Sequence, residues 1–473
     1  MTNRAIGRLW AFFLLLFFIL AARVAWVMLI AGPEIASKPY NPRHALLDAR
    51  RGRILATDGS LLAETHGNAR VYPFGEALAQ TVGYVSPRYG TSGIEDAYDR
   101  ALTPADTTGD PLAQLDEIRS AFAGTSAQSR GADVVTTIVP SIERTLWAQL
   151  SRQARGAGIV LDPSTGAVLA IASVPSYDPT HFDAEFASLA NDPESPLINR
   201  ATSGLYPPGS TFKIFTAGSA LEDGTVTMDS RFEDPGYLQI GNFTLHDNES
   251  EATGNQDLTG AFALSSNVDF AQIALKMGTD AFYDAFDKWG IGQPLDFQLP
   301  AETDRIPPKD TIVPGELAQM GFGQGALLMT PLQMALLTAT IANAGTMPRP
   351  YIVRQIVRDG KVASVTPGGT LATPVSAQTA ADVAKMMIAV VTRGTGTTAA
   401  IHGVQVAGKT GTATNPHGAA HSWFVCFAPA DHPRFVVAIV VENAGYGADV
   451  AAPIARDVLE TALATQPTPL PTP

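Results

Sequence analysis

The chain has 473 residues, of which 45% are hydrophobic and 16% charged, and its 32 Lys and Arg against 45 Asp and Glu give a net charge of −13. This composition is sufficient to bury a core, which excludes general disorder. The acidic balance argues against nucleic-acid binding, because phosphate recognition needs a basic surface. A single cysteine, Cys426, excludes an intramolecular disulfide and a multi-cysteine metal cluster.

The N-terminal region predicts a membrane anchor. Residues 9–31 are an apolar stretch interrupted only by Arg23, and at 1.5 Å per residue a helix of this length spans roughly 34 Å, enough for a bilayer core. Arg4 and Arg8 precede it without an acidic residue, so the positive-inside rule places the rest of the chain outside the cytoplasm. The alternative is a cleaved signal peptide over residues 9–22, but we find no A-x-A cleavage site.

The region after the anchor, residues 32–140, contains short apolar runs separated by turn signals. Residues 50–64 predict a strand, an Asp58-Gly59 turn and a second strand. Residues 103–130 are rich in Thr, Asp, Gly and Ser and predict a loop. The region is therefore expected to consist of short strands joined by turns.

The remaining chain has strand patterns at both ends and mostly helical sequence between them. The predicted elements are a helix at 141–154, strands at 158–161, 167–174, 404–407, 421–428 and 435–441, a helix at 452–463, and helices over much of 210–344. Residues 435–441 are apolar at every position, as expected of a central strand with helices on both faces. We predict an α+β fold with one antiparallel sheet built from both ends of this region.

A serine and a lysine three positions apart form the first candidate site. The sequence YPPGSTFK ends at Lys213, and its prolines and glycine predict a helix that opens at Ser210 and ends near Gly224. The side chains of Ser210 and Lys213 would share one helix face. A serine hydroxyl needs a base to become a nucleophile, and a lysine can serve if its pKa is lowered. The alternative is a helix-capping serine followed by an exposed lysine.

Two further motifs strengthen this interpretation. Ser265 and Asn267, in ALSSNVDFAQIA, stand between two helical stretches and could point into one cleft. Residues 409–412, Lys-Thr-Gly-Thr, lie on a predicted strand, where a cation can hold a carboxylate and a glycine permits close approach of another backbone. The order S-x-x-K, S-x-N, K-T-G indicates serine acyl transfer. The candidate residues are Ser210, Lys213, Ser265, Asn267, Lys409, Thr410, Gly411 and Thr412.

These motifs resemble those of penicillin-binding proteins and serine β-lactamases. The sequences NRATSGLYPPGSTFKI, GFGQGALLMTPLQMA and VAGKTGTA narrow the resemblance to the transpeptidase domain of class B penicillin-binding proteins, over about 141–463. The membrane anchor followed by NPRHALLDARRGRILATDGSLLAE resembles the family's non-catalytic pedestal, and the chain as a whole is most similar to the small actinobacterial members. The resemblance implies a single transmembrane helix, an extended mostly-β pedestal, and a β-lactamase/transpeptidase-like domain with a five-stranded antiparallel sheet flanked by helices.

The resemblance and the residue patterns together predict the domain organisation. The segments are a cytoplasmic tail at 1–8, a transmembrane anchor at 9–31, a dimerisation-like pedestal at 32–140, a transpeptidase domain at 141–464 and a Pro/Thr-rich tail at 465–473. By resemblance, the protein would belong to a bacterial cell membrane with its catalytic domain outside. Its partners would be peptidoglycan stem peptides on lipid-linked glycan strands and a polytopic glycosyltransferase of the shape, elongation, division and sporulation (SEDS) type. No cofactor, metal or nucleic acid is expected.

The resemblance also implies a reaction, the cross-linking of peptidoglycan by a D,D-transpeptidase. Ser210 would attack the D-Ala-D-Ala carbonyl with Lys213 as general base, and an amine of a neighbouring stem would resolve the acyl-enzyme. Ser265 would relay protons and Asn267 would hold the donor amide. β-Lactams would acylate the same serine.

Further roles are implied for the K-T-G strand. Lys409 and the two threonines beside Gly411, Thr410 and Thr412, would bind the terminal carboxylate. Backbone N–H groups of Ser210 and Thr412 would form the oxyanion hole. One departure from the S-D-N pattern is Ser266, which replaces the aspartate.

Other interpretations remain open on the sequence. Residues 403–410, GVQVAGKT, satisfy the P-loop pattern but lack the helix that must follow the lysine. A β-lactamase or a cell-wall scaffold with a degenerate site would share the three motifs. His417 and His421 could suggest a metal pair, but they flank a turn and a strand rather than a helix face. Residues 394–396, Gly-Thr-Gly, resemble a phosphate-binding loop without its strand-to-helix context.

Overall fold

A five-stranded antiparallel sheet forms the centre of the C-terminal region, in the order β17-β18-β19-β7-β8. The computed structural model describes residues 2–26, 50–67, 69–104, 130–247, 252–416 and 418–465. The strands of this sheet are β7 (Gly156–Leu161), β8 (Val168–Val174), β17 (Ala407–Ala413), β18 (His421–Ala428) and β19 (Phe435–Val441). The sheet joins both ends of the region, which confirms the predicted topology.

One predicted strand, 404–407, is wrong. Gly403 adopts φ +76°, and Val404 forms only an isolated bridge with Ile401, so these residues make a turn. The strand begins at Ala407 and continues through the K-T-G residues to Ala413.

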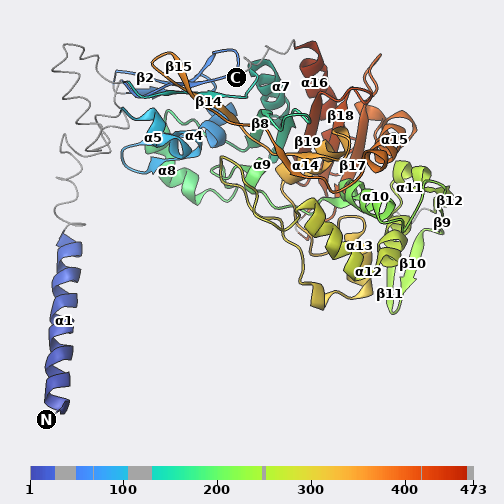
Figure 1. Ribbon diagram of the computed structural model, residues 1–473, viewed down its shortest axis with the longest axis horizontal. Coiled ribbons are helices and arrows are strands. Elements are labelled where there is room, and N and C mark those ends of the chain that lie inside the picture. The colour runs from blue at the N-terminus through green and yellow to red at the C-terminus, as the bar shows by residue number, and fades with distance from the viewer. Residues whose placement is uncertain are drawn as a thin grey trace.

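Helices cover both faces of this sheet, as Figure 1 shows. Alternate residues of β19 point in opposite directions: Val437 and Ile439 pack with α7 and α16, whereas Val436 and Ala438 pack in the cluster that contains α14. All seven residues of β19 are buried, as predicted for a central strand. The covering helices are α7 (Pro140–Leu150), α14 (Pro331–Ala342) and α16 (Ala451–Ala464). The predicted helix at 141–154 therefore ends earlier, at Leu150.

The segment between the two groups of sheet strands is only partly helical. Six short strands form three separate antiparallel pairs within it, β9 with β12, β10 with β11 and β13 with β16. Its helices are α8 (Phe182–Asn191), α9 (Arg200–Ser203), α10 (Lys213–Glu222), α11 (Leu258–Leu264), α12 (Asn267–Trp289), α13 (Pro314–Met320) and α15 (Ala377–Arg393), with 3-10 turns η5 (Gly209–Phe212), η7 (Lys309–Thr311) and η8 (Thr397–Ala399). Its strands are β9 (Arg231–Asp234), β10 (Tyr237–Ile240), β11 (Phe243–His246), β12 (Gly254–Asp257), β13 (Met347–Pro348) and β16 (Thr370–Ala372).

A second, six-stranded sheet includes the strands of the predicted pedestal, in the order β15-β14-β6-β1-β2-β3. The predicted hairpin at 50–64 is present, with Gly59 at φ +85° and the Ser60 N–H donating to Asp58 Oδ1 at 2.8 Å. Two of the six strands, β14 and β15, come from the predicted transpeptidase range, so both regions contribute to this sheet. The pedestal strands are β1 (Ile54–Leu55), β2 (Leu61–His66), β3 (Ala69–Val71), β6 (Asp133–Thr136), β14 (Val353–Arg358) and β15 (Lys361–Val365).

Short elements complete the pedestal around a buried ionic cluster. The elements are η3 (Gly75–Leu78), α3 (Ala79–Val82), β4 (Val85–Ser86), β5 (Gly90–Thr91), α4 (Gly93–Ala97) and α5 (Asp99–Leu102). Glu95 is fully buried and accepts hydrogen bonds from Arg51 Nη2 at 2.8 Å and from Arg70 Nε at 2.6 Å. Arg51 also donates to Asp99 Oδ1 at 2.7 Å. Most of the predicted loop at 103–130 lies outside the described residues.

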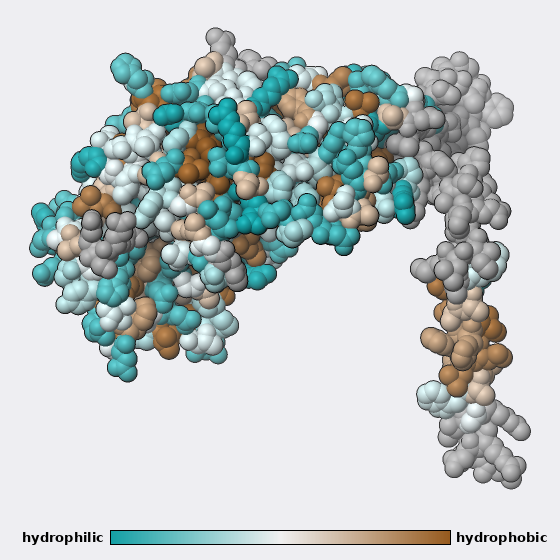
Figure 2. Space-filling model, turned by 180° about the vertical axis from the view of Figure 1, so that it is seen from behind, coloured by the Kyte–Doolittle hydropathy of each residue, from teal (hydrophilic) through white to brown (hydrophobic). Residues whose placement is uncertain are grey.

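Helix α1 (Thr2–Trp26) is the N-terminal element, and Figure 2 shows hydrophobic residues gathered along it. Its exposed apolar side chains include Leu9, Trp10 and Phe17. The predicted span at 9–31 continues beyond α1 into residues that the structure does not describe. Among the residues that it does describe, no helix combines the length and apolar character needed to cross a membrane. The predicted transmembrane helix is therefore not found in that part of the chain.

We predict that Glu95→Ala lowers the free energy of unfolding by about 3–5 kcal/mol, because it leaves buried guanidinium groups without their carboxylate. Asp296→Ala, which breaks the exposed pair with Arg349, is the control, with an expected loss below about 1 kcal/mol. Urea unfolding followed by circular dichroism measures both. Equal losses in the two variants would contradict the prediction.

Candidate active site

The first candidate residue, Ser210, lies in the 3-10 turn η5 and is only 7% exposed. The turn leads directly into α10, so the predicted helix opens with a tighter turn and ends at Glu222. Gly209 adopts φ +53°, and its N–H donates to the carbonyl of Gly323 at 2.8 Å. The Thr211 hydroxyl donates to the carbonyl of Pro208 at 2.6 Å. These bonds fix the backbone on both sides of the serine.

Two buried lysines converge on the hydroxyl of Ser265. Lys213 Nζ donates to Ser265 Oγ at 3.2 Å, to the Ser265 carbonyl at 2.5 Å and to Asn267 Oδ1 at 2.9 Å. Lys409 Nζ donates to the same Ser265 Oγ at 2.8 Å. Both lysines are 0% exposed. The structure thus brings the three motifs together, and the alternative of an exposed Lys213 is wrong.

The junction between α11 and α12 presents Ser265 and Asn267 to the lysines. Ser265 ends α11 in the left-handed region, at φ +67°, a strained conformation for a residue with a side chain. Ser266 then caps α12: its Oγ accepts from the Asp269 N–H at 3.0 Å and donates to Asp234 Oδ2 at 2.9 Å. Ser266, the residue that departs from the S-D-N pattern, therefore caps α12 and forms a hydrogen bond with Asp234.

Burial governs the protonation of both lysines. It lowers the pKa of Lys213 to about 7, although the nearby carboxylates of Asp247, Asp269 and Asp234 act to raise it. Burial, together with the Lys213 charge, lowers the pKa of Lys409 well below its usual value.

The surroundings of the lysines combine aromatic rings with carboxyl groups. The Lys213 ammonium lies 5.3 Å from the centre of the Phe270 ring, and that of Lys409 lies 5.6 Å from the centre of the Phe262 ring. Burial raises the pKa of Asp269 to about 7, with the Asp234 charge as the second cause. A neutral amine at Lys213 is therefore accessible near neutral pH, as a general base requires.

Strand β17 forms one wall of a cavity of about 400 Å³ beside Ser210. Thr410 and Thr412 both line the cavity, so their side chains face the same side of the strand. A Cβ at Gly411 would lie 2.9 Å from Thr211 Cγ2 and 3.1 Å from the carbonyl oxygen of Pro208. This glycine therefore allows the strand to approach the Ser210 turn, as predicted.

Sequence reasoning missed several residues of this cavity. Thr395, in the Gly-Thr-Gly segment that resembles a phosphate-binding loop, has its Oγ1 2.6 Å from Thr410 Oγ1. Asp247 Oδ1 accepts from the Asn267 N–H at 3.0 Å, although no motif surrounds it. The glycines around Thr395 could have indicated a close backbone contact at this segment, because a Cβ at Gly394 would lie 2.3 Å from the Ala263 carbonyl oxygen. The missed lining residues are Asp247, Thr253, Leu264, Thr395, Tyr446, Ala448 and Asp449.

The P-loop interpretation is wrong. Lys409 lies in the middle of strand β17, which continues to Ala413, whereas a P-loop lysine opens a helix. Two histidines were considered as a metal-binding pair. His421 Nδ1 accepts the Asn443 N–H at 3.1 Å, and His417 lies outside the described residues. Within the described ranges, no group of three or more His, Cys, Asp or Glu side chains could hold a metal ion.

Comparison with known proteins agrees with this geometry. Residues 156–460 match the family model for the penicillin-binding protein transpeptidase domain, and residues 51–134 match the model for the penicillin-binding protein A dimerisation domain. The chain belongs to the class B penicillin-binding proteins. This family accounts for the order and spacing of the three motifs around one cavity.

Relatives in the family match along most of their length. The chain is 35% identical to the peptidoglycan D,D-transpeptidase PbpA of Mycolicibacterium smegmatis, over 98% of this chain and 99% of that protein. It is 31% identical to the peptidoglycan D,D-transpeptidase MrdA of Haemophilus influenzae, over 83% of this chain and 69% of that protein. The solved ceftriaxone acyl-enzyme of penicillin-binding protein A from Mycobacterium tuberculosis superposes with a TM-score of 0.80 at 33% identity, covering 88% of this chain and 100% of that one.

We predict that Gly411→Ala slows acylation by penicillin G by about tenfold or more, because displacing the strand misaligns the groups around Ser210. Stopped-flow measurement of the acylation rate constant tests this. The control is Gly369→Ala, whose Cβ would meet only ordinary contacts with Arg349. An unchanged rate for Gly411→Ala would contradict the inferred close approach.

Proposed function

We propose that this penicillin-binding protein is a serine D,D-transpeptidase that cross-links peptidoglycan stem peptides through an acyl-enzyme on Ser210. The observation that carries the proposal is the hydroxyl of Ser265, which accepts hydrogen bonds from two buried lysines beside the cavity that Ser210 lines. The names of the relatives and the acyl-enzyme form of a solved relative support the same reaction.

Acylation begins with proton transfer from the Ser210 hydroxyl to the neutral amine of Lys213. The Ser210 oxygen attacks the carbonyl between the two D-alanines of the donor, and the N–H groups of Ser210 and Thr412 stabilise the oxyanion. The carbon–nitrogen bond then breaks. The proton held by Lys213 reaches the leaving amine through the hydroxyl of Ser265, and D-alanine departs.

Transfer runs through the same groups in reverse. An amine of a neighbouring stem peptide attacks the ester carbonyl, and its proton passes through Ser265 and Lys213 back to the Ser210 oxygen. A new peptide bond forms as the ester bond breaks, so the enzyme is regenerated. A β-lactam acylates Ser210 in the same way, but its leaving nitrogen remains attached to the acyl group.

Lys409, Thr410 and Thr412 recognise the donor carboxylate. Lys409 lies on β17, and the two threonines present their side chains to the cavity. A bound carboxylate would raise the pKa of Lys409 again, which couples donor binding to a fully charged lysine. The Asn267 side chain, which already accepts from Lys213, would orient the donor amide.

The setting of the enzyme is also part of the proposal. Helix α1 exposes apolar side chains around its circumference, which is typical of a segment that contacts lipid or another apolar surface. We therefore keep residues 9–31 as an anchor in a bacterial cell membrane, with the catalytic domain outside. We also propose a pedestal at 32–140, a transpeptidase domain at 141–464 and a SEDS-type glycosyltransferase as partner.

We predict that Ser210→Ala abolishes covalent labelling by a fluorescent penicillin, because no other hydroxyl replaces the nucleophile. The matched control is Ser219→Ala, a buried serine further along α10, which should label like the wild type. Labelling is measured by in-gel fluorescence of the denatured protein. Label retained in Ser210→Ala would overturn the assignment.

We predict that the acylation rate constant rises with pH, with a midpoint at about 7, because only the neutral amine of Lys213 accepts the serine proton. The charged groups that act on Lys213 and its neighbour are Asp234, Asp247, Asp269 and Lys409. Asp269→Asn removes a carboxylate that favours the ammonium, so the midpoint should move to lower pH. A flat pH profile, or an upward shift in Asp269→Asn, would argue against Lys213 as the base.

A further inference from the structure

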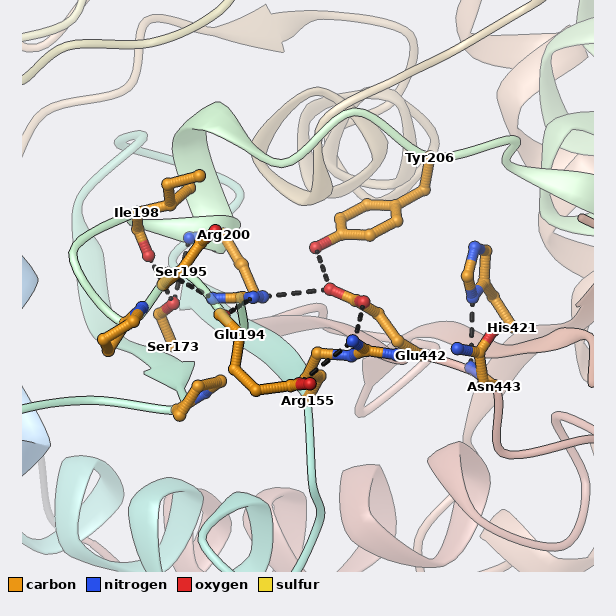
Figure 3. Close-up of polar contacts among 12 residues, drawn as sticks. Arg155, Ser173, Glu194, Ser195, Ile198, Arg200, Tyr206, His421, Glu442 and Asn443 are labelled. Atoms are coloured by element: carbon orange, nitrogen blue, oxygen red, sulfur yellow. Dashed lines mark hydrogen bonds and ion pairs between the residues drawn. The ribbon is translucent and has the colours of Figure 1, made fainter. Parts of the chain in front are cut away.

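A partly buried ionic network, drawn in Figure 3, lies just beyond the end of β19. Glu442 Oε1 accepts from Arg200 Nε at 2.9 Å and from the Tyr206 hydroxyl at 2.8 Å. Glu442 Oε2 contacts Arg155 Nε at 3.0 Å. The side chains of Glu442 and Arg200 are 14% and 7% exposed. One carboxylate thus gathers three donors from separate parts of the chain.

The same network holds the segment that leads toward the nucleophile. Arg200 donates to the carbonyls of Ser195 at 3.0 Å and Glu194 at 2.5 Å. Arg155 Nη1 donates to the Glu194 carboxylate at 2.9 Å, and the Glu442 N–H donates to the Arg155 carbonyl. The loop before α9 is therefore fastened to the end of the central strand.

Tyr206 connects this network to Ser210 over only four residues. Its N–H and carbonyl pair with the backbone of Met329 at 3.0 and 2.8 Å, and its ring packs edge-on against Trp423. The next carbonyl, that of Pro207, accepts from Trp423 Nε1 at 3.1 Å. The Tyr206 hydroxyl is the one group of this segment that the Glu442 carboxylate holds directly.

A glycine makes room for this contact. A Cβ at Gly204 would lie 2.7 Å from the Tyr206 hydroxyl oxygen and 2.6 Å from its ring. Any larger residue at position 204 would push the tyrosine away from Glu442. Gly204 does not adopt a left-handed conformation, so space rather than backbone freedom accounts for the glycine.

We propose that Glu442 is a positioning residue for acyl transfer, which acts by holding the Tyr206 hydroxyl and thereby the turn that carries Ser210. It is not a catalytic residue, because neither Glu442 nor Tyr206 lines the cavity. Two guanidinium groups hold the Glu442 carboxylate in place, so it can in turn hold the phenol hydroxyl of Tyr206. Hydrogen bonds to a charged group are stronger than those between neutral groups. The inference rests on the proposed function, because it needs Ser210 as the nucleophile.

The deciding experiment compares Tyr206→Phe with the wild type in acylation by penicillin G. The variant keeps the ring but removes the hydroxyl, so the acylation rate constant should fall about 10- to 100-fold, as expected for a displaced reacting group. The dissociation constant of the noncovalent complex should stay within about twofold, and the pH midpoint should not move, because Lys213 is untouched. In a Glu442→Gln background, Tyr206→Phe should add little further slowing.

The control is Tyr177→Phe, which removes another buried hydroxyl bond, donated to the carbonyl of Ala79 at 3.1 Å. It should lower the melting temperature as much as Tyr206→Phe does and leave acylation unchanged. If the wild type reacts and Tyr206→Phe reacts equally fast, the positioning role is overturned while the proposed function stands. If the wild type itself does not react, the proposed function fails and this inference fails with it.

Discussion

The structure depends on burying two lysine ammonium groups around one serine hydroxyl. Lys213 and Lys409 reach Ser265 from different elements, and neither is exposed to solvent. Removing a cation from water is costly, so the chain compensates with carbonyl and amide acceptors, aromatic faces and three nearby aspartates. Burial lowers the pKa of Lys213 to about 7, so a neutral amine is available near neutral pH for the base role that we propose.

Three structural features maintain this arrangement. The antiparallel sheet places β17 beside the turn that carries Ser210, and Gly411 permits the contact. The left-handed Ser265 ends α11 so that its hydroxyl faces the lysines while Ser266 caps the next helix. On the other side, the Glu442 network fixes the segment before Ser210 through Tyr206. Each feature holds its residues by specific contacts, as preorganised catalysis requires.

The sequence predicted the parts of this protein that local pattern determines. The apolar run of β19 indicated a central strand, and the spacing of Ser210, Ser265 and Lys409 indicated the site. Contacts that depend on tertiary placement were missed: Thr395 and Asp247 have no motif of their own, and β14 joins the pedestal from far along the chain. The strand at 404–407 failed because the turn at Gly403 overrides its β-branched composition. Nonlocal pairing and side-chain packing are not encoded in short windows.

The most direct test uses a synthetic stem pentapeptide ending in D-Ala-D-Ala and an amine acceptor. Purified protein is incubated with both, and free D-alanine, the cross-linked product and the mass of the peptide containing Ser210 are followed by mass spectrometry. We predict one D-alanine released for each new peptide bond, with a transient acyl group on Ser210, and no turnover in Ser210→Ala. Turnover that persists without Ser210, or an acyl group on another residue, would contradict it.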